Sequence, residues 1–413
     1  MSDEKIVAPE EQTPESNPGY SVQTEEEEAR DEKRRRWLLT LLLLLLLMLF
    51  CLCGLIYRYW KEPEPLPEIV PLPGEAVYPP HYLQSIYNLE RPVGVAVSPD
   101  GETIYVTESA GERLIKAFDK NGNLLFSFAP PETRSGERAP VYLAIDPQGR
   151  VYVTDRLQHA IFVFDAGGNF LDTILDTDLT LGEYVAKHQG GLEPGVPFVY
   201  NIFWQDVRIG EANSPQATTL PAPNRAAWAP LGVSFDAEGN LWVTDVSKTM
   251  DSVMMMPAAR FDTAPPWLDF GGDDLLAFGP KGEGMGEFMF PNASARDSQG
   301  RVFISDGNNG RVQAWSAEGE YLFAFGRGTG DGALSLPRGV FIDDKDRLYV
   351  VDAVGQDVKV FNVSGEEPVF LYTFGDFGLE DGQFNYPNDI FVDSSGRLYI
   401  VDRENHRIQI WLY

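Results

Sequence analysis

The feature that most constrains this chain is a repeat that runs from Arg91 to Tyr413. Each copy starts with a proline and a short apolar stretch, passes through a tight turn into an aromatic-rich stretch, and ends that stretch with an acidic residue. A repeat of this kind predicts an array of similar supersecondary units, and it outweighs any single motif in deciding the fold class. The copies begin at Pro92, Pro140, Pro230, Pro291, Pro337 and Pro387.

Within each copy the residue pattern is typical of short β-strands. Val151–Asp155 (VYVTD) and Leu398–Asp402 (LYIVD) consist of β-branched and aromatic residues, which fit a pleated, half-buried surface. The preceding turns, such as DPQG from Asp146, place Gly where a tight hairpin needs a positive φ. We expect four antiparallel strands per copy, and sheets this small bury both faces only when several stack around an axis.

The number of copies predicts the number of blades and the way the ring closes. The final copy reaches Tyr413 one strand short, and His81–Leu89 (HYLQSIYNL) aligns with the outer strand Tyr321–Gly326 of an earlier copy. We therefore expect His81–Leu89 to complete the last blade, since an open ring would leave an unpaired strand edge. The predicted fold class is all-β, a six-bladed β-propeller preceded by a single transmembrane helix. Its six acidic strand ends are Glu108, Asp155, Asp245, Asp306, Asp352 and Asp402.

These repeats resemble the NHL-repeat family of six-bladed β-propellers. The resemblance rests on Asn405–Trp411 (NHRIQIW) and on joining segments such as Phe374–Pro387 (FGDFGLEDGQFNYP). It covers about four-fifths of the chain and implies the propeller fold. It implies little about activity, because propellers carry many unrelated functions.

The segment before the repeats has the composition of a membrane anchor. Residues 1–36 are polar and acidic, and we expect them to form a disordered cytoplasmic tail. Residues 37–57 contain no charge and are long enough to cross a hydrocarbon core of about 30 Å. Residues 58–80 are rich in proline and predict an extended spacer. Residues 81–413 form the predicted propeller, with inserts near 178–228 and 246–272.

The charges beside the apolar run predict its orientation. Lys33, Arg34, Arg35 and Arg36 precede it, so the positive-inside rule places the N-terminus in the cytoplasm and the propeller outside. A cleaved signal peptide is the alternative, but the run is long and no small-x-small site follows it. We therefore expect a single-pass protein of the cell membrane with an extracytoplasmic propeller.

Charge and cysteine content exclude two classes of function. The net charge of −29 argues against nucleic-acid binding, which requires Lys and Arg to neutralise phosphates. The two cysteines, Cys51 and Cys53, both lie in the apolar run. The predicted propeller therefore has no disulfide framework and no cysteine-bound zinc.

Two sets of residues are candidates for metal binding on the propeller. The six acidic strand ends either cap loop N–H groups or bind a cation such as calcium through their oxygens. His159 and His406 follow Asp155 and Asp402 by four residues, and Glu112 follows Glu108 in the same way. Two histidines and a carboxylate on adjacent blades match a catalytic zinc set.

The spacing VTDRLQH (Val153–His159) is also similar to a motif of the peptidyl-hydroxyglycine amidating lyases. These are zinc propellers that hold the metal with histidines on several blades. The resemblance implies a metal-dependent lyase or hydrolase, although Thr249 stands where a further histidine is expected.

The remaining candidates bind ligands rather than metals. Asn388, Asp389, Asn292 and Arg338 are polar residues at the start of predicted inner strands, and we expect them at one mouth of the central channel. The alternative is that they bond to connecting loops and channel water. In the inserts, Phe203, Trp204, Met254–Met256 and Trp267 form either an apolar recognition surface or a cap packed on the propeller.

The resulting hypothesis is a membrane-tethered binding or scaffold module that holds a protein or small-molecule ligand on a propeller face. The alternative is a metal-dependent lyase or hydrolase, with zinc or calcium as the candidate cofactor.

Overall fold

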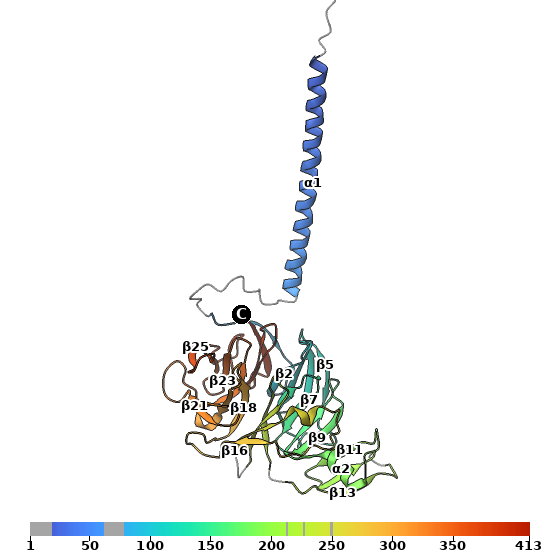
Figure 1. The fold of residues 1–413 in the computed structure, drawn as a ribbon, viewed down its shortest axis with the longest axis vertical. Helices are drawn as coiled ribbons and strands as arrows, with labels where there is room; N and C mark the ends of the chain where they lie inside the picture. The colour runs from blue at the N-terminus through green and yellow to red at the C-terminus, as the bar shows by residue number, and fades with distance from the viewer. Residues whose placement is uncertain (1–18, 62–77, 212–213, 226–227, 248–250) are drawn as a thin grey trace, which may run out of the picture. The chain divides into compact units, whose positions relative to one another are not determined.

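The computed structural model describes residues 19–61, 78–211, 214–225, 228–247 and 251–413, which fall into two compact units, Met1–Leu66 and Pro67–Tyr413. The described part of the first unit is one helix, α1 (Gly19–Lys61), shown in Figure 1. Within α1, residues Glu32–Gly54 are long and apolar enough to cross a membrane.

The helix begins earlier than the sequence analysis predicted. We expected residues 1–36 to be disordered, but 19–36 are helical and continuous with the apolar run. This segment contains five Glu and four Arg residues, which have high helix propensity. Arg36 also pairs with Glu32 one turn away at 2.8 Å. Residues 1–18, and residues 62–77 of the proline-rich spacer, lie outside the described residues.

The second unit contains six sheets of four or five antiparallel strands, which we number as blades 1 to 6. Blade 1 comprises β2 (Pro92–Val97), β3 (Thr103–Glu108), β4 (Ile115–Asp119) and β5 (Leu124–Phe128). Blade 2 comprises β6 (Pro140–Ile145), β7 (Val151–Asp155), β8 (Ala160–Phe164), β9 (Phe170–Asp176) and the short β10 (Leu179–Thr180). Blade 3 comprises β14 (Pro230–Phe235), β15 (Leu241–Val246), β16 (Asp251–Met256) and β17 (Leu276–Phe278).

The C-terminal half of this unit follows the same plan. Blade 4 comprises β18 (Pro291–Arg296), β19 (Val302–Asp306), β20 (Arg311–Trp315) and β21 (Tyr321–Phe325), with the 3-10 turn η2 (Gly307–Asn309). Blade 5 comprises β22 (Pro337–Ile342), β23 (Arg347–Asp352), β24 (Asp357–Asn362) and β25 (Val369–Phe374). Blade 6 comprises β26 (Pro387–Val392), β27 (Leu398–Asp402), β28 (Arg407–Leu412) and β1 (His81–Ile86).

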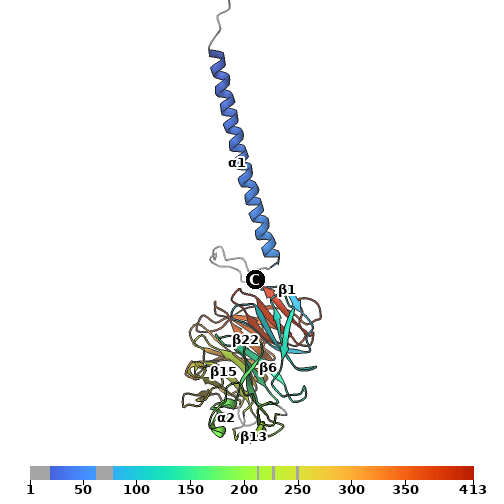
Figure 2. The same ribbon diagram turned by 90° about the vertical axis from the view of Figure 1, so that its right-hand side faces the viewer.

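The six sheets close into a ring. The first strands β2, β6, β14, β18, β22 and β26 contact one another in cyclic order, so they form the wall of a central channel. Strand β1 pairs with β28, with Ile86 opposite Ile408, and Figure 2 shows β1 beside the C-terminal end of the chain. Both the all-β propeller and its closure by the N-terminal strand are confirmed.

Neighbouring blades are joined by hydroxyl groups as well as by apolar packing. A Thr or Ser near the end of the second strand donates its hydroxyl hydrogen to a carbonyl on the inner strand of the next blade. One such bond joins Thr154 Oγ1 to the Leu231 carbonyl at 2.7 Å. The other three donor and acceptor pairs are Thr107 with Val141, Thr244 with Asn292, and Ser305 with Arg338.

The inner strands approach one another closely at the second residue after the proline. A Cβ atom at Gly232 would lie 2.1 Å from the Asn292 carbonyl oxygen, and one at Gly339 would lie 2.6 Å from the Asp389 Cα. Contacts this short are sterically forbidden, so the ring needs glycine at these two positions. Blade 2 instead carries Tyr142 at the corresponding place.

Two long connections pack on blades 2 and 3. The first contains α2 (Leu181–Gln189) and a separate sheet of β11 (Phe198–Asn201), β12 (Asp206–Ile209) and β13 (Thr218–Pro221), seen beside β9 in Figure 1. Leu181, Val185 and Val207 from this connection are buried in one apolar cluster with Phe162 of blade 2. The second connection contains the 3-10 turn η1 (Ala258–Phe261) and buries its Phe261 and Trp267 beside Tyr152.

Candidate functional site

The six acidic strand ends hold the loops that enter their own blades. Each carboxylate is at most 2 % exposed. Each accepts a backbone N–H from the segment just before the inner strand, at 2.7–2.9 Å. These contacts are the loop-capping role that the sequence analysis weighed against cation binding. The N–H donors are Glu90, Ala139, Ala229, Met289, Leu336 and Asn385.

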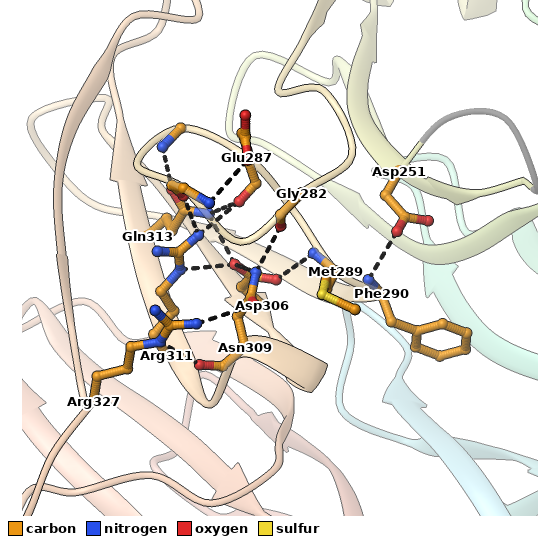
Figure 3. A network of polar contacts seen from close by, with 12 residues as sticks. Asp251, Gly282, Glu287, Met289, Phe290, Asp306, Asn309, Arg311, Gln313 and Arg327 are labelled. Atoms are coloured by element: carbon orange, nitrogen blue, oxygen red, sulfur yellow. Dashed lines mark hydrogen bonds and ion pairs between the residues drawn. The ribbon is translucent and has the colours of Figure 1, made fainter.

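Figure 3 shows the most extensive of these networks, around Asp306. Its carboxylate accepts hydrogen bonds from Asn309 Nδ2 and Arg311 Nε, both at 2.8 Å, and from Gln313 Nε2 at 3.0 Å. Blade 6 repeats this network around Asp402, with Asn405, Arg407 and Gln409 as the donors. The polar residues of the motif NHRIQ therefore serve the blade itself.

The two recurring histidines occupy a position set by a turn. His159 and His406 have φ angles of 50° and 56°, in the left-handed region, just before the third strand of their blades. Gly310 and Gln356 have φ angles of 60° and 63° at the same place in blades 4 and 5. Left-handed residues are uncommon outside glycine, and histidine is among the side chains enriched there. The recurrence of histidine thus has a local conformational reason.

The structure does not gather the predicted zinc set. Glu112 is 75 % exposed and pairs with Arg138 at 3.6 Å. His406 Nδ1 lies 3.3 Å from the Arg91 backbone nitrogen and from the Leu89 carbonyl oxygen. Over the described ranges, no group of three or more His, Cys, Asp or Glu side chains is placed to hold a metal ion. Thr249 lies outside those ranges.

Three of the four predicted polar residues, Asn292, Asn388 and Arg338, lie at one end of the channel, which we name the proline-side mouth because the inner strands begin there with their prolines. Asn292 and Asn388 are buried, and the Asn388 amide donates to the Val93 carbonyl at 2.7 Å. Arg338 Nη1 donates to Asn292 Oδ1 at 2.7 Å, and its Nη2 donates to the Tyr386 hydroxyl at 3.4 Å. The two amides bond mainly to neighbouring blades, and Arg338 is the half-buried polar group of the predicted set.

Sequence reasoning missed five further residues around this mouth: Arg91, Arg156, Phe290, Tyr386 and Arg403. Arg91, Phe290 and Tyr386 each precede an inner-strand proline, whereas Arg156 and Arg403 each follow an acidic strand end. The sequence did contain one indication of them. At the equivalent positions several other blades carry a small or aliphatic residue, namely Ala, Leu, Gly or Val. Only the closed ring shows that they face one another.

The other end of the channel opens into a cavity of about 390 Å³. All six inner strands line it, with mainly apolar residues that include Val95, Phe341 and Phe391. Asp389 is a buried carboxyl group in its wall and accepts a hydrogen bond from the Val95 N–H at 3.1 Å. Among the described residues no Lys or Arg pairs with it, and burial raises the pKa of its carboxyl group to about 7.

This raised pKa predicts a pH-dependent stability. The unfolded carboxyl has a pKa of about 3.9, so between roughly pH 4 and pH 7 the folded state holds a proton that the unfolded state releases. Stability should therefore fall as the pH rises through this window, by up to about 1.4 kcal/mol per pH unit. The side chain of the Asp389→Asn variant cannot titrate. The free energy of unfolding of the variant minus that of the wild type should therefore increase by about 2 kcal/mol from pH 5 to pH 7. Urea unfolding of both proteins measures this gain, and a pH-independent difference would contradict it.

The insert residues divide between core and surface. Met254, Met256 and Trp267 are buried in the core, as the capping alternative predicted. Phe203 is 53 % exposed at the turn between β11 and β12. Trp204 is covered by the guanidinium of Arg208, 3.7 Å from its ring centroid. Neither Phe203 nor Trp204 lines the channel cavity.

The ring of repeated four-stranded sheets defines the class of protein as a β-propeller. The family model described as "NHL repeat" matches residues 384–411, which span β26 to β28 of blade 6. The same pattern of strand, turn and acidic strand end recurs around the ring. The family model and the repeated sheets together support the NHL-repeat β-propeller that the motifs predicted.

The chain is also similar to individual proteins. It is 29 % identical over 159 residues to peptidyl-glycine alpha-amidating monooxygenase B of Xenopus laevis, an alignment that spans 37 % of this chain and only 17 % of that protein. The virginiamycin B lyase of Staphylococcus aureus is 13 % identical with a TM-score of 0.48, covering 80 % of this chain and 98 % of the lyase. A gluconolactonase of Xanthomonas campestris is 14 % identical with a TM-score of 0.49, covering 84 % of this chain and all of the enzyme. Neither structural likeness identifies a function.

Proposed function

We propose that this chain is a membrane-tethered binding module whose extracytoplasmic propeller holds a small-molecule or peptide ligand on the axis of its ring. The apolar part of α1 provides the tether, and the basic residues 33–36 before it favour a cytoplasmic N-terminus. The acidic composition of the chain disfavours nucleic acid as the ligand.

One observation carries this proposal. The recurring acidic strand ends, and the Arg and Gln side chains around them in blades 4 and 6, are occupied in hydrogen bonds within their own blades. On the ring axis, by contrast, the lining residues change from blade to blade, and the channel offers a cavity of about 390 Å³ and a polar mouth. A concave, mainly apolar site with a few converging polar groups is the usual form of a ligand site.

A cavity-filling variant tests the proposal. Ala295 lines the cavity at the inner-strand position where blades 5 and 6 carry Phe341 and Phe391. Ala295→Phe should fill the cavity with a side chain that the ring already accepts at this position, and Ala166→Phe on an exposed turn is the matched control. The full-length wild type and both variants, purified in detergent, are exposed to fractionated cell extract, and retained small molecules are identified by mass spectrometry. We expect compounds that the wild type and Ala166→Phe retain and Ala295→Phe loses, whereas identical retention profiles would overturn the proposal.

A metal-dependent lyase is the second candidate function, and the alignment with the amidating monooxygenase is the observation that favours it. His159, His406 and Glu112 are the residues that the sequence analysis assigned to its metal. Elemental analysis of the purified full-length protein, with thermal melting in the presence and absence of a chelator, tests this candidate. Stoichiometric zinc that disappears in the His159→Ala/His406→Ala double variant would support it, and a metal-free wild type would exclude it.

A further inference from the structure

The proline-side mouth carries an unusual charge for this protein. The chain as a whole has a net charge of −29, yet four arginines, Arg91, Arg156, Arg338 and Arg403, come from four different blades to this mouth. Three of them lie close enough to repel one another. Burial lowers the pKa of the Arg403 guanidinium most, and charge repulsion from Arg91 and Arg338 lowers it further. Like charges gathered in this way are unfavourable unless an opposite charge joins them.

The arginines are connected through two aromatic rings. The guanidinium carbons of Arg156 and Arg338 lie 5.6 and 5.8 Å from the centroid of the Phe290 ring. Arg338 reaches onward to the Tyr386 hydroxyl, and the guanidinium carbon of Arg403 lies 5.5 Å from the Tyr386 ring centroid. Because Arg156 belongs to blade 2 and Arg338 to blade 5, this arrangement extends across the mouth.

The protein supplies too few acceptors for these side chains. Glu404 pairs with both Arg91 and Arg403, whereas within the described part of the chain no carboxylate pairs with Arg156 or Arg338. The Nε atoms of Arg91, Arg338 and Arg403 are buried without a hydrogen-bond acceptor. Since each guanidinium has five N–H donors, the mouth has both excess positive charge and unused donors.

The backbone at this mouth is also strained. Arg91, Phe290 and Tyr386, which directly precede inner-strand prolines, have φ angles of 52°, 61° and 55°. Bulky side chains rarely adopt this left-handed conformation, which costs of the order of 1 kcal/mol or more at each residue. Strain of this kind collects at ligand-binding positions, and here it falls on the residues that make up the arginine and aromatic surface.

From these observations we infer that the proline-side mouth binds a small acidic ligand by its carboxylate or phosphate group. The inference rests on the proposed function and adds the chemical class of the ligand. The planar guanidinium fork matches both oxyanions and bonds to them through two N–H groups at once. Phe290 and Tyr386 would hold the guanidinium groups in place and contact the apolar part of the ligand.

The test uses the full-length protein in detergent, with citrate as the carboxylate probe and inorganic phosphate as the phosphate probe. Binding is measured by isothermal titration calorimetry at increasing sodium chloride concentration. We expect saturable binding of at least one probe, weakened by salt as charge attraction is screened. Arg156→Gln and Arg338→Gln should each weaken binding about tenfold or more, since each removes charged hydrogen bonds.

Two further variants make the test specific. Glu404→Gln removes the carboxylate that competes for Arg91 and Arg403, so it should tighten binding. Arg208→Gln removes an arginine stacked on an aromatic ring elsewhere, in the insert, and should leave binding unchanged. Thermal melting checks that each variant is folded. If Arg338→Gln does not fold, the result for Arg156→Gln alone decides the test. The relative affinities of the two probes identify the favoured oxyanion.

Two results would overturn the inference: neither probe binds, or binding is equal in the wild type and Arg156→Gln. The cavity experiment is independent of this one. Suppose that the wild type retains compounds that Ala295→Phe loses, but binds neither citrate nor phosphate. This result would reject the inference and would still support the proposed function.

Discussion

Replacing Asp306 by alanine is expected to lower the free energy of unfolding by about 3–5 kcal/mol. The carboxylate accepts from the Met289 N–H at 2.7 Å and from three side chains, one of which is the guanidinium of Arg311. Arg311 is 4 % exposed, so its charge cannot be solvated once its partner is lost. Breaking a buried pair on one side is costly because the remaining charge stays uncompensated. Urea or guanidinium unfolding, followed by circular dichroism, measures the loss.

A matched control separates this effect from a general effect of removing acids. Asp331→Ala removes an exposed aspartate from the joiner between blades 4 and 5 and should change stability by no more than about 0.5 kcal/mol. The double variant Asp306→Ala/Arg311→Met removes both charges and should regain part of the lost stability. Equal unfolding midpoints for Asp306→Ala and Asp331→Ala would show that the recurring acids do not hold the blades.

Recurrence in the sequence predicted the parts of this molecule that are set by local geometry. The acidic strand ends, the turns and the β1 strand all follow from the requirements of one blade, and each requirement recurs. The two histidines also recur for a local reason. His159 and His406 recur because a left-handed turn residue is needed before the third strand, a place that Gly310 fills equally well. A residue that recurs in every copy is therefore explained first by the structure of a single blade, and only then by function.

The candidate site could not be predicted in the same way because its members do not recur. Arg156 and Arg403 look like ordinary turn residues, and nothing in their local sequence relates them to Phe290 or Tyr386. They become neighbours only when the ring closes and brings blades 2, 4, 5 and 6 to one mouth. The burial of Asp389 could not be predicted for the same reason. Its hydrogen bond with Val95 joins residues from the two ends of the propeller sequence, which meet only when the ring closes.

Deleting residues 81–86 is expected to abolish the monomeric fold. Strand β1 has the only described pairing on the free side of β28, and Ile86 is 2 % exposed in a cluster shared by blades 1 and 6. Burial of a side chain such as Ile86 contributes about 1.5–3 kcal/mol, and each backbone hydrogen bond about 0.5–1.5 kcal/mol. Their sum approaches the whole stability of a typical domain, about 5–15 kcal/mol.

The deletion also creates an aggregation site. Without β1, the N–H and C=O groups of β28 form an open strand edge, which can pair with another copy of the chain. We therefore expect size-exclusion chromatography to show aggregates and circular dichroism to show no cooperative melting. Deleting residues 68–73 shortens the chain by the same length within the proline-rich segment and should leave a monomeric, cooperatively melting propeller. A monomeric 81–86 deletion with wild-type melting would mean that the ring is closed by contacts other than those of β1, and that the N-terminal strand is not required for the fold.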